Sequence, residues 1–132
     1  MAAAALPSGL IDTVFLDAER GLADAIGFLA MQYAAAGIHF SSISAMELIV
    51  GCRNQQELAK VLTSIASASI HEVSEAIALN ARDWLAQYFL SHGLQLADAL
   101  IAATAKDCRL PLYTKNVRHF QMLPGLVVVR PY

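Results

Sequence analysis

Three widely separated acidic residues occupy positions from which they could act together. Asp12 follows a short apolar segment, while Glu47 and Asp98 each lie near the start of an apolar helical segment. Strand ends and helix starts gather at one edge of a parallel sheet, so these carboxylates are expected to converge. Clustered carboxylates repel one another and raise one another's pKa values unless a cation is present. The placement therefore predicts an acidic site that binds a metal ion.

Polar residues after a later apolar segment would complete this site. Residues 110–113 predict a short strand, and Thr114 and Asn116 follow it closely. Their side chains could hold a water molecule or a carboxylate by hydrogen bonds. Lys115 and Arg118 could contact phosphates. Because the acidic ligands offer only oxygen, the preferred ion is Mg²⁺ or Mn²⁺ rather than zinc. Such sites commonly activate water for attack on a phosphodiester.

Each of these residues also has a simpler structural explanation. An aspartate at a helix start, such as Asp98, is often favoured only by the helix dipole. Ser44 and Glu47 have the spacing of a capping box, so Glu47 could merely cap its own helix. Asp12 could form a turn, and the polar residues after the strand could simply terminate it. Only the joint placement favours a site, and periodicity alone leaves the two explanations about equal.

The elements that would position these residues alternate along the chain. Strands are expected near residues 10–16, 38–40, 70–71, 110–113 and 126–129. Helical spacing of apolar residues predicts helices at 22–33, 44–51, 54–65 and 74–92, and another that starts near Asp98. This alternation predicts an α/β fold, a three-layer α/β/α sandwich with a central, mostly parallel sheet. The β-branched run at 126–129 suits a strand covered on both faces.

Composition limits the class of protein. The 132 residues are 57% hydrophobic and 15% charged, which suits a single folded domain over 1–132. Residues 1–8 are expected to be a frayed or expression-derived end rather than a signal peptide. No apolar run approaches the roughly 20 residues needed to span a bilayer, so no membrane association is expected. Cys52 and Cys108 lack metal or redox spacing and are expected to be reduced, buried thiols.

Net charge restricts how the chain could contact nucleic acid. The formal net charge is −2, so no broad basic patch is implied. Any contact with a nucleic acid would have to use local cations and metal ions. The four histidines show no metal-ligand spacing and are expected at the surface or at strand ends. Among them, His119 is the one expected nearest to a substrate.

In four blocks the sequence resembles a PIN domain, and within that family the small VapC-type toxins of bacterial toxin–antitoxin pairs. The blocks follow the family's order and span nearly the whole chain. They are LIDT at 10–13, SISAMEL at 42–48 with Gly51, LADALIAATA at 96–105, and LYTKNVRHF at 112–120 with PGL at 124–126. Each block is weakly specific alone, and the four together are fairly specific.

The resemblance implies a metal-dependent endoribonuclease with the catalytic residues Asp12, Glu47, Asp98, Thr114 and Asn116. The three carboxylates would be the ligands of Mg²⁺ or Mn²⁺. Contacts to the RNA substrate would come from Thr13, Lys115 and Arg118. The resemblance also implies a cytoplasmic homodimer that is inhibited by a cognate antitoxin, whose tail enters the site.

Three departures from the family's pattern bear on activity. Val14 stands where the family often has Asn or Asp, Asp17 arrives early, and Asn116 replaces a carboxylate that would support a second metal ion. They leave open a degenerate PIN domain that binds nucleic acid or a partner without cutting. A phospho-acceptor receiver domain is disfavoured, because the segment 70–72 lacks the acceptor aspartate that such a domain needs after its third strand.

Overall fold

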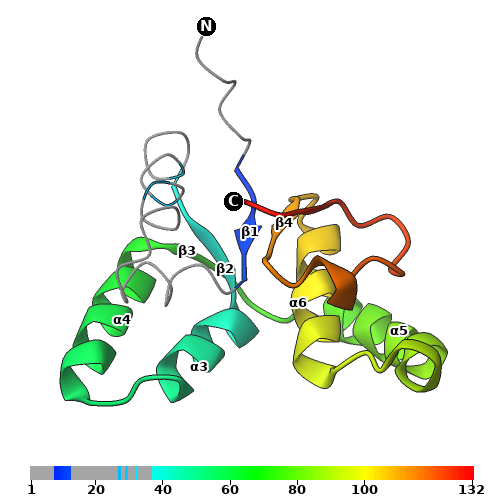
Figure 1. Ribbon diagram of the computed structural model, residues 1–132, viewed down its shortest axis with the longest axis horizontal. Coiled ribbons are helices and arrows are strands. Elements are labelled where there is room, and N and C mark those ends of the chain that lie inside the picture. The colour runs from blue at the N-terminus through cyan, green and yellow to red at the C-terminus, as the bar shows by residue number, and fades with distance from the viewer. Residues whose placement is uncertain (1–7, 13–26, 28, 30–31, 33–36) are drawn as a thin grey trace, which may run out of the picture.

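A parallel five-stranded sheet forms the centre of the protein. The computed structural model describes residues 8–12, 27, 29, 32 and 37–132 (Figure 1). The strands are β1 (Leu10–Ile11), β2 (His39–Ser41), β3 (Ser69–His71), β4 (Leu112–Tyr113) and β5 (Val128–Val129). Their order across the sheet is β3-β2-β1-β4-β5, and every neighbouring pair is parallel. The predicted α/β fold with a parallel sheet is confirmed.

In the part of the chain that the structure describes, four helices and one short 3-10 turn have defined bounds. They are α3 (Ser42–Val50), α4 (Gln55–Ser67), α5 (Glu75–His92), α6 (Leu96–Asp107) and η1 (Val117–His119). Asn54 and Ser74 cap α4 and α5 by accepting hydrogen bonds from backbone N–H groups, as their positions predict. The helix predicted at 22–33 lies largely outside the described residues, as do Thr13, Val14 and Asp17.

The start of α3 corrects one prediction. Ser41, the last residue of β2, is the N-cap, and its hydroxyl accepts a hydrogen bond from the Ser44 N–H at 2.9 Å. The helix begins at Ser42 because the chain turns directly from strand to helix. Glu47 therefore lies in the second turn of α3, and the prediction that it stands in the first turn is wrong. The capping-box explanation for Glu47 is removed as well.

Two hydrophobic clusters cover the two faces of the sheet. Side chains alternate across a strand, so neighbouring residues of β1 point to opposite faces. Leu10 packs with Leu112 and with residues of α5 and α6, whereas Ile11 packs with Tyr113, Phe40 and residues of α3 and α4. Figure 1 shows the same division, with α3 and α4 on one side of the sheet and α5 and α6 on the other. The three-layer arrangement is therefore as predicted.

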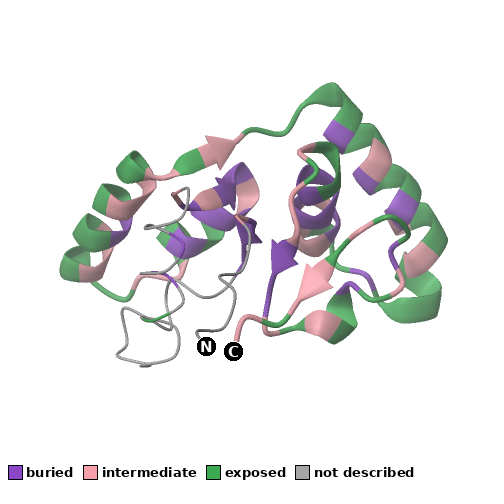
Figure 2. Cartoon of the chain, turned by 90° about the horizontal axis from the view of Figure 1, so that it is seen from above, coloured by how far each residue is buried: buried purple, intermediate pink, exposed green. Residues whose placement is uncertain are grey.

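The last strand differs from its expected place. β5 forms an edge of the sheet, Val128 and Val129 are only half-buried, and Val127 is 63% exposed. Figure 2 shows β1 and β4 buried and the strand that leads to the C-terminus only partly covered. Val128 packs against the cluster that contains Leu10, and Val129 packs against the cluster that contains Ile11. The predicted cover on both faces is therefore only partial, because β5 is an edge strand.

Composition also predicted no membrane-spanning helix and two buried, reduced cysteines. Within the described part of the chain, no helix is both long enough and apolar enough to cross a membrane. Cys52 and Cys108 carry free thiols and are half-buried rather than fully buried. The Cys108 thiol lies 3.4 Å from Nδ1 of His71.

Candidate active site

The register of two central strands brings the first pair of predicted residues together. β1 and β4 are parallel neighbours with Leu10 opposite Leu112 and Ile11 opposite Tyr113. The next opposed residues are Asp12 and Thr114, at the carboxyl ends of their strands. The backbone N–H of Asp12 donates to the carbonyl of Tyr113 at 3.0 Å, which continues the ladder to this point. Strand register alone thus places residues that lie far apart in sequence side by side.

Thr114 holds the Asp12 carboxylate in a fixed place. Its Oγ1 donates a hydrogen bond to Oδ2 of Asp12 at 2.9 Å, and the same Oγ1 accepts one from the backbone N–H of Asn116 at 3.0 Å. Thr114 is fully buried and Asp12 is 6% exposed. A buried polar group without a partner is costly, so this chain of hydrogen bonds stabilises both the strand end and the carboxylate. Thr114 thus holds a carboxylate by a hydrogen bond, which the sequence predicted for it.

Two further carboxylates reach the same edge from helices. Glu47 lies on the exposed side of α3, and Asp98 lies in the first turn of α6. Gln95 is the N-cap of α6 and makes no side-chain capping hydrogen bond, and Asp98 follows it by three residues, where the helix dipole favours a carboxylate. Although Glu47 is exposed overall, partial burial of its carboxyl group raises its pKa, and the nearby Asp98 raises it further. Burial also raises the pKa of Asp98.

The electrostatics of Asp12 connect the three acids. Burial raises the pKa of Asp12 from 3.8 to about 6, and the hydrogen bond from Thr114 opposes that increase. The charges of Asp98 and Glu47 both raise it further, so all three carboxylates lie close enough to repel one another. A cation placed among them would relieve this repulsion and lower all three pKa values. The three predicted acids therefore affect one another's charge at this edge of the sheet.

The donor set fits a hard divalent cation that keeps part of its water shell. Across the described residues, no group of three or more His, Cys, Asp or Glu side chains is already arranged to hold a metal ion. The three carboxylates therefore interact electrostatically without forming a closed cage. Mg²⁺ usually keeps several waters and binds through only one or two carboxylates, so an open oxygen site of this kind suits it. Zinc, which prefers four closed ligands with nitrogen or sulfur among them, is a poorer match.

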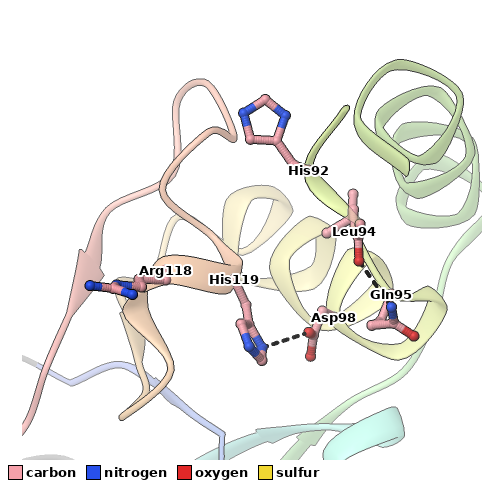
Figure 3. Close-up of a pocket in the computed structure, with 7 residues that line it drawn as sticks. His92, Leu94, Gln95, Asp98, Arg118 and His119 are labelled. Carbon is pink, nitrogen blue, oxygen red and sulfur yellow. Dashed lines mark hydrogen bonds and ion pairs between the residues drawn. The ribbon is translucent and has the colours of Figure 1, made fainter. Parts of the chain in front are cut away.

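His119, the histidine expected nearest to a substrate, contacts Asp98 at this site. Nδ1 of His119 lies 3.3 Å from Oδ2 of Asp98, and this contact lowers the pKa of Asp98 against the effect of burial. The His119 side chain is 56% exposed and that of Asp98 is 19% exposed. Both line a pocket of about 340 Å³ between α6 and η1, which Figure 3 shows. In the sequence, the position of His119 three residues after Asn116 is the feature that points to this site.

Basic residues lie on the other side of η1. Lys115 is half-buried, with its Nζ 5.5 Å from the centre of the Tyr132 ring. Arg118 is exposed and lines the Asp98 pocket as well as a second one that Lys115 and Asn116 share. Arg130 also lines the second pocket, and no sequence pattern pointed to it. These residues could contact a phosphate beside the acidic edge, as predicted for Lys115 and Arg118.

Comparison with protein-family models gives one match. The model described as PIN domain matches residues 10–123, which includes every predicted site residue. Among curated proteins, the chain is similar to Ribonuclease VapC10 of Mycobacterium tuberculosis, with 37% identity over 119 residues that cover 89% of each chain.

Solved structures with the same fold come from toxin–antitoxin complexes. A toxin–antitoxin complex from Klebsiella pneumoniae contains a chain with 31% identity and a TM-score of 0.77, covering 95% of this chain and 98% of that one. DNA-bound VapBC from Salmonella typhimurium contains a chain with 17% identity and a TM-score of 0.72, covering 96% and 100%. At 17% identity, the second likeness carries the fold alone.

Proposed function

Because the chain belongs to the PIN domain family, and within it to the VapC ribonucleases, we propose that it is a metal-dependent endoribonuclease of a toxin–antitoxin pair. One observation carries this proposal. The Asp12 carboxylate is held in place by a hydrogen bond from Thr114. Its burial, together with repulsion from Asp98 and Glu47, raises its pKa to about 6 against the opposing effect of that hydrogen bond. Carboxylates with perturbed pKa values cluster at functional sites, and a bound cation would offset the repulsion among these three.

The reaction is hydrolysis of a phosphodiester in RNA. Water attacks the phosphorus, one P–O ester bond breaks, and the departing oxygen takes up a proton. When bound, Mg²⁺ or Mn²⁺ supplies positive charge for the phosphate and a water of lowered pKa. Asp12, Glu47 and Asp98 would be the ligands, and Thr114 keeps Asp12 oriented.

The remaining side chains would hold the RNA. Asn116 completes the polar corner beside Thr114, and Arg118 and Lys115 pair with phosphates. The alternative role for Asn116 is structural, because its backbone N–H already donates to Thr114. A substrate contact from Thr13 stays a prediction, since Thr13 lies outside the described residues.

The proposal includes protein partners and a location. The curated relative is named a ribonuclease, and the similar Klebsiella pneumoniae structure is a toxin–antitoxin complex. We therefore propose that a cognate antitoxin binds this chain and blocks its site. We also propose a homodimer, because large apolar side chains on α3 and α5 are exposed, among them Val50 at 82% and Leu90 at 94%. The proposed location is the cytoplasm, where an RNA substrate is available.

Incubation of the pure protein with single-stranded RNA tests the proposed function. Cleavage is expected with Mg²⁺ or Mn²⁺, and none with an excess of chelator. A parallel sample of Asp12→Asn should give no cleavage with metal, which excludes a contaminating nuclease. Equal cleavage with metal and with chelator would remove the metal mechanism. RNA binding without cleavage under any metal condition would instead favour the non-catalytic, degenerate PIN domain.

A further inference from the structure

The second pocket beside η1 has a lining unlike that of the acidic site. It has a volume of about 490 Å³ and is lined by Lys115, Asn116, Val117, Arg118, His119 and Arg130. Arg118 and His119 also line the Asp98 pocket, so the two hollows meet at η1. In Figure 3, His119 points toward Asp98, whereas Arg118 leaves η1 in a different direction. The 3-10 turn thus contributes Arg118 and His119 to both neighbouring hollows.

Positive charge is concentrated in this second pocket. The whole chain has nine lysines and arginines and a net charge of −2. Three of the nine, Lys115, Arg118 and Arg130, line this one pocket, and none of the described residues that line it is acidic. A third of the basic side chains therefore gather next to a carboxylate cluster that by itself would repel a polyanion. Such a local field attracts an anionic ligand to a protein that is acidic overall.

Arg130 is held in place by the backbone rather than by a carboxylate. Its Nε donates to the carbonyl of Tyr132 at 3.0 Å, and its Nη1 donates to the carbonyl of Lys115 at 3.3 Å. An arginine has five N–H donors, so three remain without a partner among the described residues. Arg118 likewise pairs with no carboxylate within the described segments. The guanidinium of Arg130 is thus held in place beside the exposed guanidinium of Arg118 in one pocket, and arginine forks match phosphate geometry.

We propose that this pocket binds a phosphate of the RNA strand next to the phosphate that is cleaved, with Arg130 and Arg118 as its ligands. The proposal rests on the proposed ribonuclease function and adds a subsite to it. Phosphates recur along a nucleic acid strand, so a strand that crosses η1 places one at the acidic edge and another in the basic pocket. Arg130 is then a binding residue, which acts on affinity for RNA and not on the bond that breaks.

Binding to a fluorescent single-stranded RNA, measured by anisotropy with chelator present, tests this subsite. The chelator prevents cleavage, so only affinity is measured, and a series of salt concentrations gives the salt dependence. Arg130→Ala should weaken binding by roughly 3–10-fold and lower the salt slope by about 0.7, the value for one phosphate contact on a single strand. Arg130→Lys should keep the slope and lose part of the affinity, because it keeps the charge without the fork. Arg82→Ala, at an exposed position on α5, should bind as wild type does.

Several results would overturn the subsite. The first is that Arg130→Ala binds RNA with the same affinity and salt slope as the wild type. The second is that the wild type does not bind RNA. The third is that Arg130→Ala changes only the inhibition by an antitoxin. If Arg130→Ala does not fold, Arg130→Lys with wild-type affinity overturns it equally. Cleavage with Mg²⁺ is scored separately. Cleavage together with binding independent of Arg130 refutes the subsite alone. Binding that depends on Arg130 without any cleavage refutes the ribonuclease and keeps the subsite.

Discussion

At the scale of single residues, Asp12 is the central group of the proposed metal site. It is buried, it is held by one hydroxyl, and two other carboxylates repel it. Burial and repulsion both favour its protonated form, while the Thr114 hydrogen bond favours the charged form. This balance makes Asp12 sensitive to pH, to metal and to the loss of the Thr114 hydroxyl. Each sensitivity can be measured separately.

The stability of the metal-free protein should depend on pH through Asp12. Its folded pKa of about 6 lies above the ordinary 3.8, so between those values the folded state holds a proton that the unfolded state releases. The free energy of unfolding from this group therefore falls as pH rises from 3.8 to about 6 and stays lower above that. The full effect is on the order of 3 kcal/mol. Denaturant unfolding across this range should show the fall in wild type and a flatter profile in Asp12→Asn. Parallel profiles would contradict the assignment.

Removal of the donor to Asp12 should also be measurable. Thr114→Val keeps the shape but removes the hydroxyl that donates to Asp12 and accepts from Asn116. We expect a loss of roughly 1–3 kcal/mol in the free energy of unfolding near neutral pH, where Asp12 is charged. Thr114→Ser retains the hydroxyl and serves as the matched control. Equal stability of the Val and Ser variants would mean that this hydrogen bond contributes little.

At the scale of elements, the site depends on how closely β1 and β4 approach each other. Their register places Asp12 beside Thr114, and the backbone N–H of Leu10 donates to the carbonyl of Pro111 at 2.8 Å. Gly9 lies at the start of this contact. A Cβ added there would lie 2.7 Å from the Pro111 carbonyl oxygen and 2.6 Å from Cδ2 of Tyr113. Real Cβ atoms do not come so close, so glycine is required at this position.

Gly9→Ala should therefore disturb both the sheet and the site. Separation of β1 from β4 would cost roughly 1–3 kcal/mol of stability and would move Asp12 away from Thr114. We expect lower cleavage activity together with the loss of stability. Gly27→Ala is the matched control, because a Cβ there meets nothing within 4 Å. Unfolding and cleavage assays on both variants check this, and two variants with identical behaviour would refute the close-approach argument.

The elements also show what the sequence could and could not predict. Alternating strands and helices indicated the parallel sheet, and one edge of a parallel sheet is where Asp12 and Thr114 were expected and found. The start of α3 was misplaced, because Ser41 and Ser44 both have the chemistry of a cap and only the end of β2 decides between them. The contact of His119 with Asp98 and the position of Arg130 depend on how η1 and the last segment fold back, which has no local pattern.

At the scale of the whole molecule, exposed apolar surface points to association. Met46, Ile49 and Val50 on α3 are 55%, 37% and 82% exposed. Phe89 and Leu90 near the end of α5 are 55% and 94% exposed. Large apolar groups gathered in this way usually meet a partner surface. A toxin chain that both dimerises and binds an antitoxin needs more than one such surface.

Light scattering of the isolated chain should report a homodimer. The expected mass is about twice the 14.2 kDa of one chain. A charge placed in the interface by Val50→Glu or Leu90→Glu should return the monomer mass in at least one of the two variants. A wild-type protein that stays monomeric at high concentration would count against the dimer and leave the exposed surfaces to the antitoxin.

The central claim is that Asp12, Glu47 and Asp98 together bind a divalent cation. Isothermal titration of Mn²⁺ into the wild type and Asp98→Asn tests it most directly, because it needs neither RNA nor activity. The account predicts a saturable binding heat for the wild type and at least about tenfold weaker binding for Asp98→Asn, equivalent to roughly 1.4 kcal/mol. Asp83→Asn, at an exposed position on α5, should bind as the wild type does. Equal Mn²⁺ affinity in the wild type and Asp98→Asn would mean that Asp98 is not a ligand.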